Sequence, residues 1–193
     1  MNKVQLGPST ILYPMPALLI GANVDGKPNF MTAAWSGIAC SDPPMLTVAV
    51  QHRRFTYQGI KETGFFSVNV PSTEMVREAD YCGIVTGERE DKVATCHFNV
   101  FYGAAKSAPL IEQCPVNLEC RLMQNLNLGT HALLIGRIEE VHVSEECLSD
   151  GKPDIVKINP LIFSVGADRA YYSIGLRLAK AFSIGSGLSK SKA

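Results

Sequence analysis

The sequence predicts a mainly β protein, an antiparallel barrel carrying two or three short helices. Three observations support this. Residues 116–128 alternate apolar and polar side chains, which is typical of a strand with two unlike faces. The tight-turn dipeptide Asp25-Gly26 joins two strand-like runs. Segments with helical spacing are too few to follow nearly every strand, as a doubly wound parallel sheet would require.

The expected strands follow one another along most of the chain. Residues 17–24 and 29–35 form a hairpin around Asp25-Gly26. Further strands are expected at 45–50, 65–70, 116–128, 131–143 and 161–166. In 116–128, Val116, Leu118 and Cys120 share an apolar face, and Asn117 and Glu119 share the opposite, polar one.

Two helices interrupt these strands. Tyr57, Ile60 and Gly64 mark a short helix with Thr56 as its N-cap. Residues 73–82 form a second helix, capped by Ser72 or Thr73. The length of 193 residues is that of a single domain, with a polar tail from about residue 186 that is expected to be mobile.

Composition excludes several classes of function. The 18 basic and 18 acidic residues cancel, so no global field attracts nucleic acid or an anionic membrane. No apolar run approaches the roughly 18 residues that span a bilayer, and no signal peptide precedes the first strand, so the expected location is cytoplasmic. The six cysteines lack a C-x-x-C spacing and are expected to be reduced, and no metal site is expected.

A basic turn follows the apolar run 46–50. Arg53 and Arg54 stand immediately before the helix that Thr56 is expected to cap. The start of a helix offers free backbone N–H groups and the positive end of a dipole, so this corner predicts an anion site. The alternative is that both arginines are solvated surface charges before an ordinary helix.

The segment 29–37 departs from strand alternation into small residues and contains Trp35, the only tryptophan of the chain. Small side chains let a flat ligand approach the backbone, and an indole offers a face to an aromatic ring. The alternative is that Trp35 is an ordinary core residue.

Several motifs in order resemble the flavin reductase-like FMN-binding split-barrel family. They are N-x-M-T-A-A-W (29–35), S-D-P-P (41–44), R-x-T (54–56) and F-x-V-N-V-P (66–71). R-E-A-D-Y (77–81), Asp91-Lys92, L-G-T-H (128–131) and K-I-N-P-L (157–161) are similar to its flavoredoxin branch. The resemblance runs from about residue 12 to about residue 185.

This resemblance implies a Greek-key split barrel, a non-covalently bound FMN, and a homodimer with its sites at or near the subunit interface. The anion would be the FMN phosphate, bound by Arg54 and Thr56, with Arg53 as a further candidate. The isoalloxazine would lie along the segment from Met31 to Trp35. The residues of that segment are Met31, Thr32, Ala33, Ala34 and Trp35. The remaining candidates are Lys92 as a second cation and Asn29, His131 and Phe163 as flavin neighbours.

For three of these candidates an ordinary structural role is the alternative. Lys92 lies in a charge run that would otherwise be a solvated loop, His131 would be a hydrogen-bonded histidine at a strand end, and Phe163 would be a core residue.

The function implied is that of an electron-transfer flavoprotein, which exchanges electrons with a redox partner such as an iron–sulfur protein. The first alternative is an NAD(P)H-dependent flavin reductase. The second is a β-barrel binding module that holds no flavin.

Overall fold

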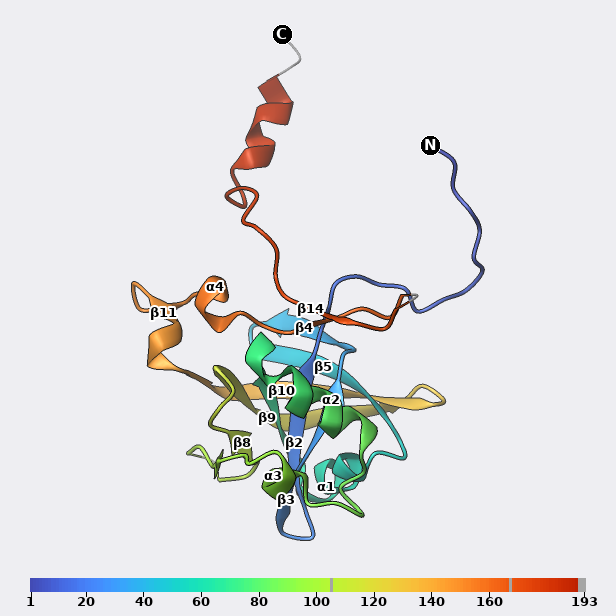
Figure 1. The fold of residues 1–193 in the computed structure, drawn as a ribbon, viewed down its shortest axis with the longest axis vertical. Coiled ribbons are helices and arrows are strands. Elements are labelled where there is room, and N and C mark those ends of the chain that lie inside the picture. Colours follow the sequence, from blue (N-terminus) through green and yellow to red (C-terminus); the bar gives the residue numbers. More distant parts are fainter. Residues whose placement is uncertain (105, 167, 191–193) are drawn as a thin grey trace.

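A computed structural model describes residues 1–104, 106–166 and 168–190 of the chain. Its centre is one antiparallel sheet of seven strands (Figure 1), with bounds β2 (Leu18–Val24), β3 (Lys27–Ala33), β4 (Ser36–Ser41), β5 (Pro44–Gln51), β6 (Phe65–Val70), β9 (Val116–Asn127) and β10 (His131–Val143). The strand order across the sheet is β3-β2-β6-β9-β10-β5-β4. The predicted mainly β fold with short helices is confirmed.

The sheet curls around a single large core, so that β3 and β5 contact each other although they are not neighbours in the sheet. Met31 of β3 and Val48 of β5 belong to the same buried cluster. Helix α1 (Phe55–Thr63) packs on β2 and sends Tyr57 and Ile60 into this core. A Cβ at Gly59 would lie 2.0 Å from the carbonyl oxygen of Asn23, so only glycine lets α1 come this close.

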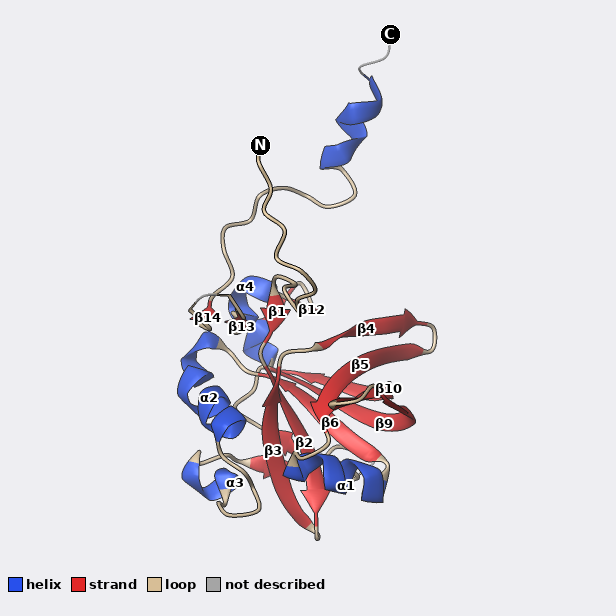
Figure 2. Ribbon diagram, turned by 90° about the vertical axis from the view of Figure 1, so that its right-hand side faces the viewer, coloured by secondary structure: helices blue, strands red, loops and turns tan. Residues whose placement is uncertain are grey.

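A second apolar cluster lies on the outer side of β2 and β3. It is covered by α2 (Val76–Ile84) and α3 (Lys92–Thr95), which both contact β3 (Figure 2). Leu19, Phe30 and Cys82 are among its buried members. The helix expected over 73–82 is divided, because Thr73–Met75 forms a separate 3₁₀ turn, η1, before α2 begins.

The remaining elements are short. β1 (Met15–Pro16), β13 (Ile162–Phe163) and β14 (Tyr171–Tyr172) form a small sheet in the order β1-β13-β14. β7 (Val100–Phe101) pairs with β8 (Leu110–Ile111), and β11 (Leu148–Ser149) with β12 (Lys152–Pro153). The others are η2 (Glu145–Cys147), α4 (Ile155–Ile158) and η3 (Ile184–Lys190).

Strand β4 was not predicted. It pairs with β5 at one edge of the sheet, and its Gly37, Ile38 and Ala39 are exposed. An edge strand of small residues lacks the apolar–polar alternation that marks a half-buried strand, and therefore gives no clear signal in the sequence.

The polar face of β9 is partly buried. β8 and the connection from β7 to β8 lie over Asn117 and Glu119, which are 4% and 2% exposed. Asn117 Nδ2 donates to the carbonyl oxygen of Ile111 at 2.8 Å, and Ile111 N donates to Asn69 Oδ1 at 3.0 Å. The side-chain amides of Asn69 and Asn117 thus bond to the backbone of Ile111 in β8 and to each other, so this part of the polar face is buried with its hydrogen bonds satisfied.

Both ends of the chain extend away from the barrel (Figures 1 and 2). The polar tail expected from about residue 186 falls in η3, and residues 191–193 lie outside the described residues; its mobility stays a prediction. Among the described residues, none of the helices has the length and apolar character needed to cross a bilayer.

Candidate functional site

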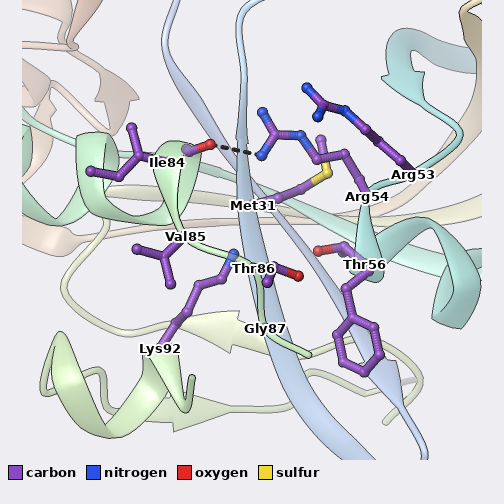
Figure 3. Close-up of a pocket in the computed structure, with 11 residues that line it drawn as sticks. Met31, Arg53, Arg54, Thr56, Ile84, Val85, Thr86, Gly87 and Lys92 are labelled. Carbon is purple, nitrogen blue, oxygen red and sulfur yellow. Dashed lines mark hydrogen bonds between the residues drawn. The ribbon is translucent and has the colours of Figure 1, made fainter. Parts of the chain in front are cut away.

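Two cavities meet at Met31 and Arg54. The first, the cation cavity, measures about 400 Å³ (Figure 3). It is lined by Met31, Arg53–Thr56, Gly83–Gly87 and Lys92. The second, the tryptophan cavity, measures about 410 Å³ and is lined by Met31–Trp35, Ala49, Gln51, Arg54, His131, Phe163, Val165 and Arg169.

The cation cavity opens at the start of α1. Arg54 occupies the N-cap position with an extended backbone, and no side chain caps the helix. The prediction that Thr56 is the cap is therefore wrong, because a turn closed by Arg54 N and Gln51 O (3.0 Å) starts the helix two residues earlier. The first-turn N–H groups, those of Phe55 and Thr56 included, have no carbonyl of the same helix available to them.

Thr56 still places its hydroxyl on this cavity. The side chain is buried, and Oγ1 accepts a hydrogen bond of 2.7 Å from Nδ2 of Asn29. Since a hydroxyl can accept and donate at once, this bond leaves its proton for a further acceptor. Asn29 is in turn held against the 83–87 loop, where a Cβ at Gly87 would lie 1.8 Å from Asn29 Oδ1.

The two arginines differ. Arg54 is half-buried, and its Nη1 donates to the carbonyl oxygen of Gly83 at 2.7 Å, which bridges the start of α1 and the end of α2 (Figure 3). Burial, and secondarily the charge of Arg53, lowers the pKa of Arg54. Arg53 is exposed, with Nε bonded to Gln51 Oε1 at 2.8 Å. Arg54 is therefore the more firmly positioned of the two.

Lys92 is not a solvated loop residue. It is 3% exposed and begins α3, whose N-cap Asp91 accepts from Ala94 N at 3.0 Å. Its Nζ donates to the carbonyl oxygens of Phe30 (2.7 Å) and Cys82 (3.1 Å). Burial lowers the pKa of Lys92; the Cys82 thiol opposes this shift and Arg54 adds to it.

Across the part of the chain that the structure describes, the ion pairs involve neither Arg54 nor Lys92. A buried charge that lacks an opposite charge is costly, and hydrogen bonds to carbonyl dipoles offset only part of the cost. The cavity is therefore suited to an anion that reaches the helix start, Thr56 and both cations together.

The tryptophan cavity has a mixed lining, in which apolar and aromatic side chains stand beside Thr32, Gln51 and Arg169. Trp35 is 39% exposed, so it is not the core residue of the alternative interpretation. Its ring lies against that of His131, with centroids 4.8 Å apart and planes inclined by 31°. His131 begins β10 opposite Gln51 of β5, and its Nδ1 lies 2.8 Å from Thr130 Oγ1. The hydroxyl of Thr32 donates to Ala79 O, which ties this wall to α2.

The structure brings most of the predicted residues together. Met31 and Arg54 line both cavities. The predicted residues that line only the cation cavity are Arg53, Thr56 and Lys92. Those that line only the tryptophan cavity are Thr32, Ala33, Ala34, Trp35, His131 and Phe163. Asn29 lines neither of these two cavities and lies behind Thr56, so its contact is made through that hydroxyl. Phe163 also packs against Tyr171, with ring centroids 5.6 Å apart.

Sequence reasoning missed several parts of the lining: the 83–87 segment, which comprises the end of α2 and the loop after it, and the residues Ala49, Gln51, Phe55, Val165 and Arg169. The spacing of Gly83 and Gly87 was the available signal for the loop, since glycines allow close approach of a backbone. The other residues reach the site only through tertiary packing.

Comparisons with known proteins agree with this geometry. The model of the flavin reductase-like domain matches residues 10–172. The crystal structure of flavoredoxin from Methanosarcina acetivorans is 41% identical, with a TM-score of 0.92 over 97% of this chain and 100% of that one. Flavoredoxin of Desulfovibrio vulgaris (Miyazaki F) is 42% identical, with a TM-score of 0.89 over 95% of this chain and 100% of that one.

A relative from Archaeoglobus fulgidus whose function is uncharacterised is 37% identical over 145 residues, which are 75% of this chain and 80% of the relative. The match of the family model extends over far more than half of the sequence and includes every residue that lines the two cavities. The chain therefore belongs to the flavin reductase-like domain family.

Proposed function

We propose that the chain binds FMN without a covalent bond and acts as an electron-transfer flavoprotein. One observation carries this proposal: two cations without acidic partners and a helix start face one cavity, which joins an aromatic cavity of similar size. A flavin mononucleotide has a matching outline, with a doubly charged phosphate at one end and a flat ring at the other. Its ribityl chain would pass Met31 and Arg54.

The phosphate is assigned to the cation cavity. Arg54 and Lys92 supply charge, Thr56 supplies a hydroxyl proton, and the first turn of α1 supplies backbone N–H groups. Asn29 keeps the Thr56 hydroxyl oriented by donating to its oxygen. Arg53 lies at the rim, where it adds charge and a smaller share of the binding free energy.

The isoalloxazine is assigned to the tryptophan cavity. Met31 to Trp35 would lie along the ring, with His131 and Phe163 on other sides. A bound flavin supplies the capacity to take up and release electrons. The protein's own groups bind it, keep its ring plane fixed and shape the electrostatic field around it.

Lys92 has a second consequence for this chemistry. A buried ammonium without a carboxylate partner favours any negative charge that is added nearby. Within reach of the flavin ring it would favour the reduced, anionic flavin and raise the midpoint potential.

In this proposal the bound flavin transfers electrons between redox proteins, and an iron–sulfur protein is one such partner. Two copies of the chain form a homodimer. The alternative is an NAD(P)H-dependent flavin reductase, which would use the same flavin site. Both differ from a binding module without flavin, which would remain colourless after incubation with FMN.

An anaerobic experiment distinguishes these possibilities. The FMN-loaded protein is mixed with NADH, with NADPH, or with a reduced ferredoxin-type protein, and the flavin absorbance is followed by stopped flow. We expect fast bleaching by the iron–sulfur protein and slow bleaching by either nicotinamide. The opposite order of rates would assign the chain to the reductases.

A further inference from the structure

Two cysteines stand at the ends of the segment that forms one wall of the cation cavity. Cys82 lies in the last turn of α2, and Cys96 is the C-cap of α3. Between them in the sequence lie residues 83–87 and Lys92, which line the cavity. The cysteines themselves line neither the cation cavity nor the tryptophan cavity. A link between them would therefore join the two ends of this wall without entering the site.

The two thiols contact each other. The thiol of Cys82 donates a hydrogen bond to the sulfur of Cys96. Both side chains belong to the second apolar cluster, where Cys82 is buried and Cys96 is half-buried. In a disulfide the two sulfurs lie about 2.05 Å apart, so a hydrogen-bonded pair of thiols needs only a small shift of two short helices to become one.

The other cysteines have different partners. Cys114 also lies near Cys82, but its thiol donates to the sulfur of Met75 at 3.8 Å. Backbone carbonyl oxygens accept hydrogen bonds from the thiols of Cys40, Cys120 and Cys147. All six cysteines are free. The pair at the ends of the wall is thus present as two thiols that are already in contact.

Lys92 is held between these two cysteines through the main chain. Its Nζ donates to the carbonyl oxygen of Cys82 at 3.1 Å, and its own carbonyl oxygen accepts from Cys96 N at 3.0 Å. One end of the residue is thus positioned by α2 and the other by α3. A covalent bond between the two sulfurs would restrain both supports of the buried ammonium at once.

We propose that Cys82 and Cys96 form a redox-active dithiol, which small-molecule disulfides oxidise to a disulfide that joins the ends of the segment 83–95. The closed loop restrains the wall of the cation cavity and slows the release of the ligand bound there. This effect on release rests on the proposed function, in which the ligand is FMN. The formation of the disulfide does not depend on it.

The exchange balances with the small disulfide as the only oxidant. Cys96 reacts first because it is the more accessible thiol. Its thiolate attacks one sulfur of the small disulfide, the S–S bond breaks, and the first small thiol leaves and takes up the proton of Cys96. Cys82 then loses its proton, and its sulfur attacks that of Cys96 and expels the second small thiol, which takes up this proton. The two protein sulfurs lose two electrons in all, and one small disulfide is reduced to two thiols.

The surroundings of the pair make it slow to react at neutral pH. Burial, and then the neighbouring Cys96, raises the pKa of the Cys82 thiol to about 12. Burial also raises the pKa of Cys96, although the hydrogen bond from Cys82 opposes this shift. Among the charged groups that face the pair, Glu78 raises both pKa values and Lys92 lowers them. Since the thiolate is the nucleophile, the exchange becomes faster as the pH rises.

Mass spectrometry tests the disulfide. The full chain, with and without FMN, is incubated with oxidised glutathione at mildly alkaline pH, its remaining thiols are alkylated, and its peptides are mapped without reduction. We expect a cross-linked pair of peptides that contains Cys82 and Cys96 and that separates on treatment with dithiothreitol. An unmodified pair, a glutathione that stays on Cys96, or a link from Cys82 to Cys114 would each overturn the proposal.

Two variants complete this experiment. Cys96→Ser removes the half-buried thiol of the pair, and we expect no cross-link. The matched control is Cys40→Ser, which removes another half-buried cysteine, in β4 and outside the pair. We expect the control to form the cross-link to the same extent as the wild type. A cross-link that disappears in the control would show that the wrong cysteine has been paired.

The rate of FMN release tests the effect on the cavity. Oxidised and reduced proteins are diluted, and the fluorescence of the released flavin is followed over time. We expect oxidation to slow release by about threefold or more, because the wall must move for the phosphate to leave and its two ends are now joined. In Cys96→Ser the oxidant should leave the rate unchanged.

The outcomes separate the two proposals. Equal release rates in the oxidised and reduced wild type would overturn the effect on the cavity even where the cross-link forms. A chain that binds no FMN in either state would overturn the proposed function. The disulfide would then still be decided by the peptide map of the flavin-free protein.

Discussion

The cation cavity and the tryptophan cavity share two residues but are built in opposite ways. In the cation cavity the ammonium of Lys92 is buried and the side chain of Arg54 is half-buried, and both donate hydrogen bonds to backbone carbonyls. In the tryptophan cavity the main contacts are between ring faces, and Trp35 is partly open to solvent. Rigid, desolvated charges supply affinity, whereas an open aromatic wall leaves a ligand accessible. We therefore expect binding free energy to be concentrated at one end and electron exchange at the other.

Removing the buried ammonium should break this asymmetry most strongly. We expect Lys92→Met to weaken FMN binding by about 2 kcal/mol, roughly thirtyfold, because a charge-assisted hydrogen bond to a buried group is lost. Isothermal titration calorimetry gives the dissociation constant. Lys27→Met, which removes an exposed cation from the start of β3, is the matched control and should bind as the wild type does.

The same variant sharpens the electrostatic part of the comparison. We expect the midpoint potential of Lys92→Met to fall, since the reduced anionic flavin loses a stabilising charge. Spectroelectrochemical titration measures it. A potential that stays constant while affinity falls would confine Lys92 to the phosphate end of the site.

Removing the hydroxyl beside the helix start should have the next largest effect. We expect Thr56→Ala to cost about 1 to 2 kcal/mol of FMN binding, because one donor to the phosphate is lost and Asn29 loses its acceptor. Thr56→Ser keeps the hydroxyl and is the control. Equal affinities of all three proteins would remove Thr56 from the phosphate contacts.

A pH titration should expose the lowered pKa of Lys92. The ammonium deprotonates in the free protein at a lower pH than in the complex, since a bound phosphate restores its charge. Affinity should therefore fall as pH rises above that lowered pKa, by no more than about tenfold per pH unit. The Lys92→Met variant should lack this component; a fall of the same size in the variant would assign it to another group.

The folding equilibrium of the flavin-free protein changes in the opposite direction. The unfolded chain holds the proton of Lys92 up to its ordinary pKa, whereas the folded chain releases it earlier. Between these two values the unfolded state binds more protons, so the contribution of Lys92 to the free energy of unfolding rises with pH. Urea unfolding of the wild type and Lys92→Met across this range measures the difference.

The smallest effect is expected at the tryptophan. We expect Trp35→Phe to change the FMN dissociation constant by less than about 1 kcal/mol, because an aromatic face remains. The absorption band of the bound flavin should nevertheless change shape. A loss of affinity as large as that of Lys92→Met would contradict the division of roles between the two cavities.

Much of the barrel could be predicted from the sequence because its strands have local signals. The turn at Asp25-Gly26 has positive φ at both residues, 50° and 74°, as a tight hairpin demands. The strands at 65–70 and 131–143 have the predicted bounds because apolar runs end there at Pro71 and begin at the Gly129-Thr130 turn.

The site was predicted less completely, and for a physical reason. The charge run around Lys92 has the composition of a solvated loop, and only the packing of α3 against β3 buries its ammonium. The start of α1 was misplaced by two residues because the turn from Gln51 to Arg54 has no marker of its own. Burial and long-range contacts decide such features, and a local pattern does not contain them.

One short stretch, from Met31 at the junction of the two cavities to Trp35 at the far wall, fixes the position of the tryptophan cavity relative to the cation cavity. Met31 to Ala33 belong to β3, and Ala34 and Trp35 follow the end of that strand, so the main chain itself connects the two cavities. The site therefore favours ligands whose charged group and flat ring are separated by the distance between the two cavities. A flavin without its terminal phosphate would fill the tryptophan cavity and leave the cation cavity without an anion.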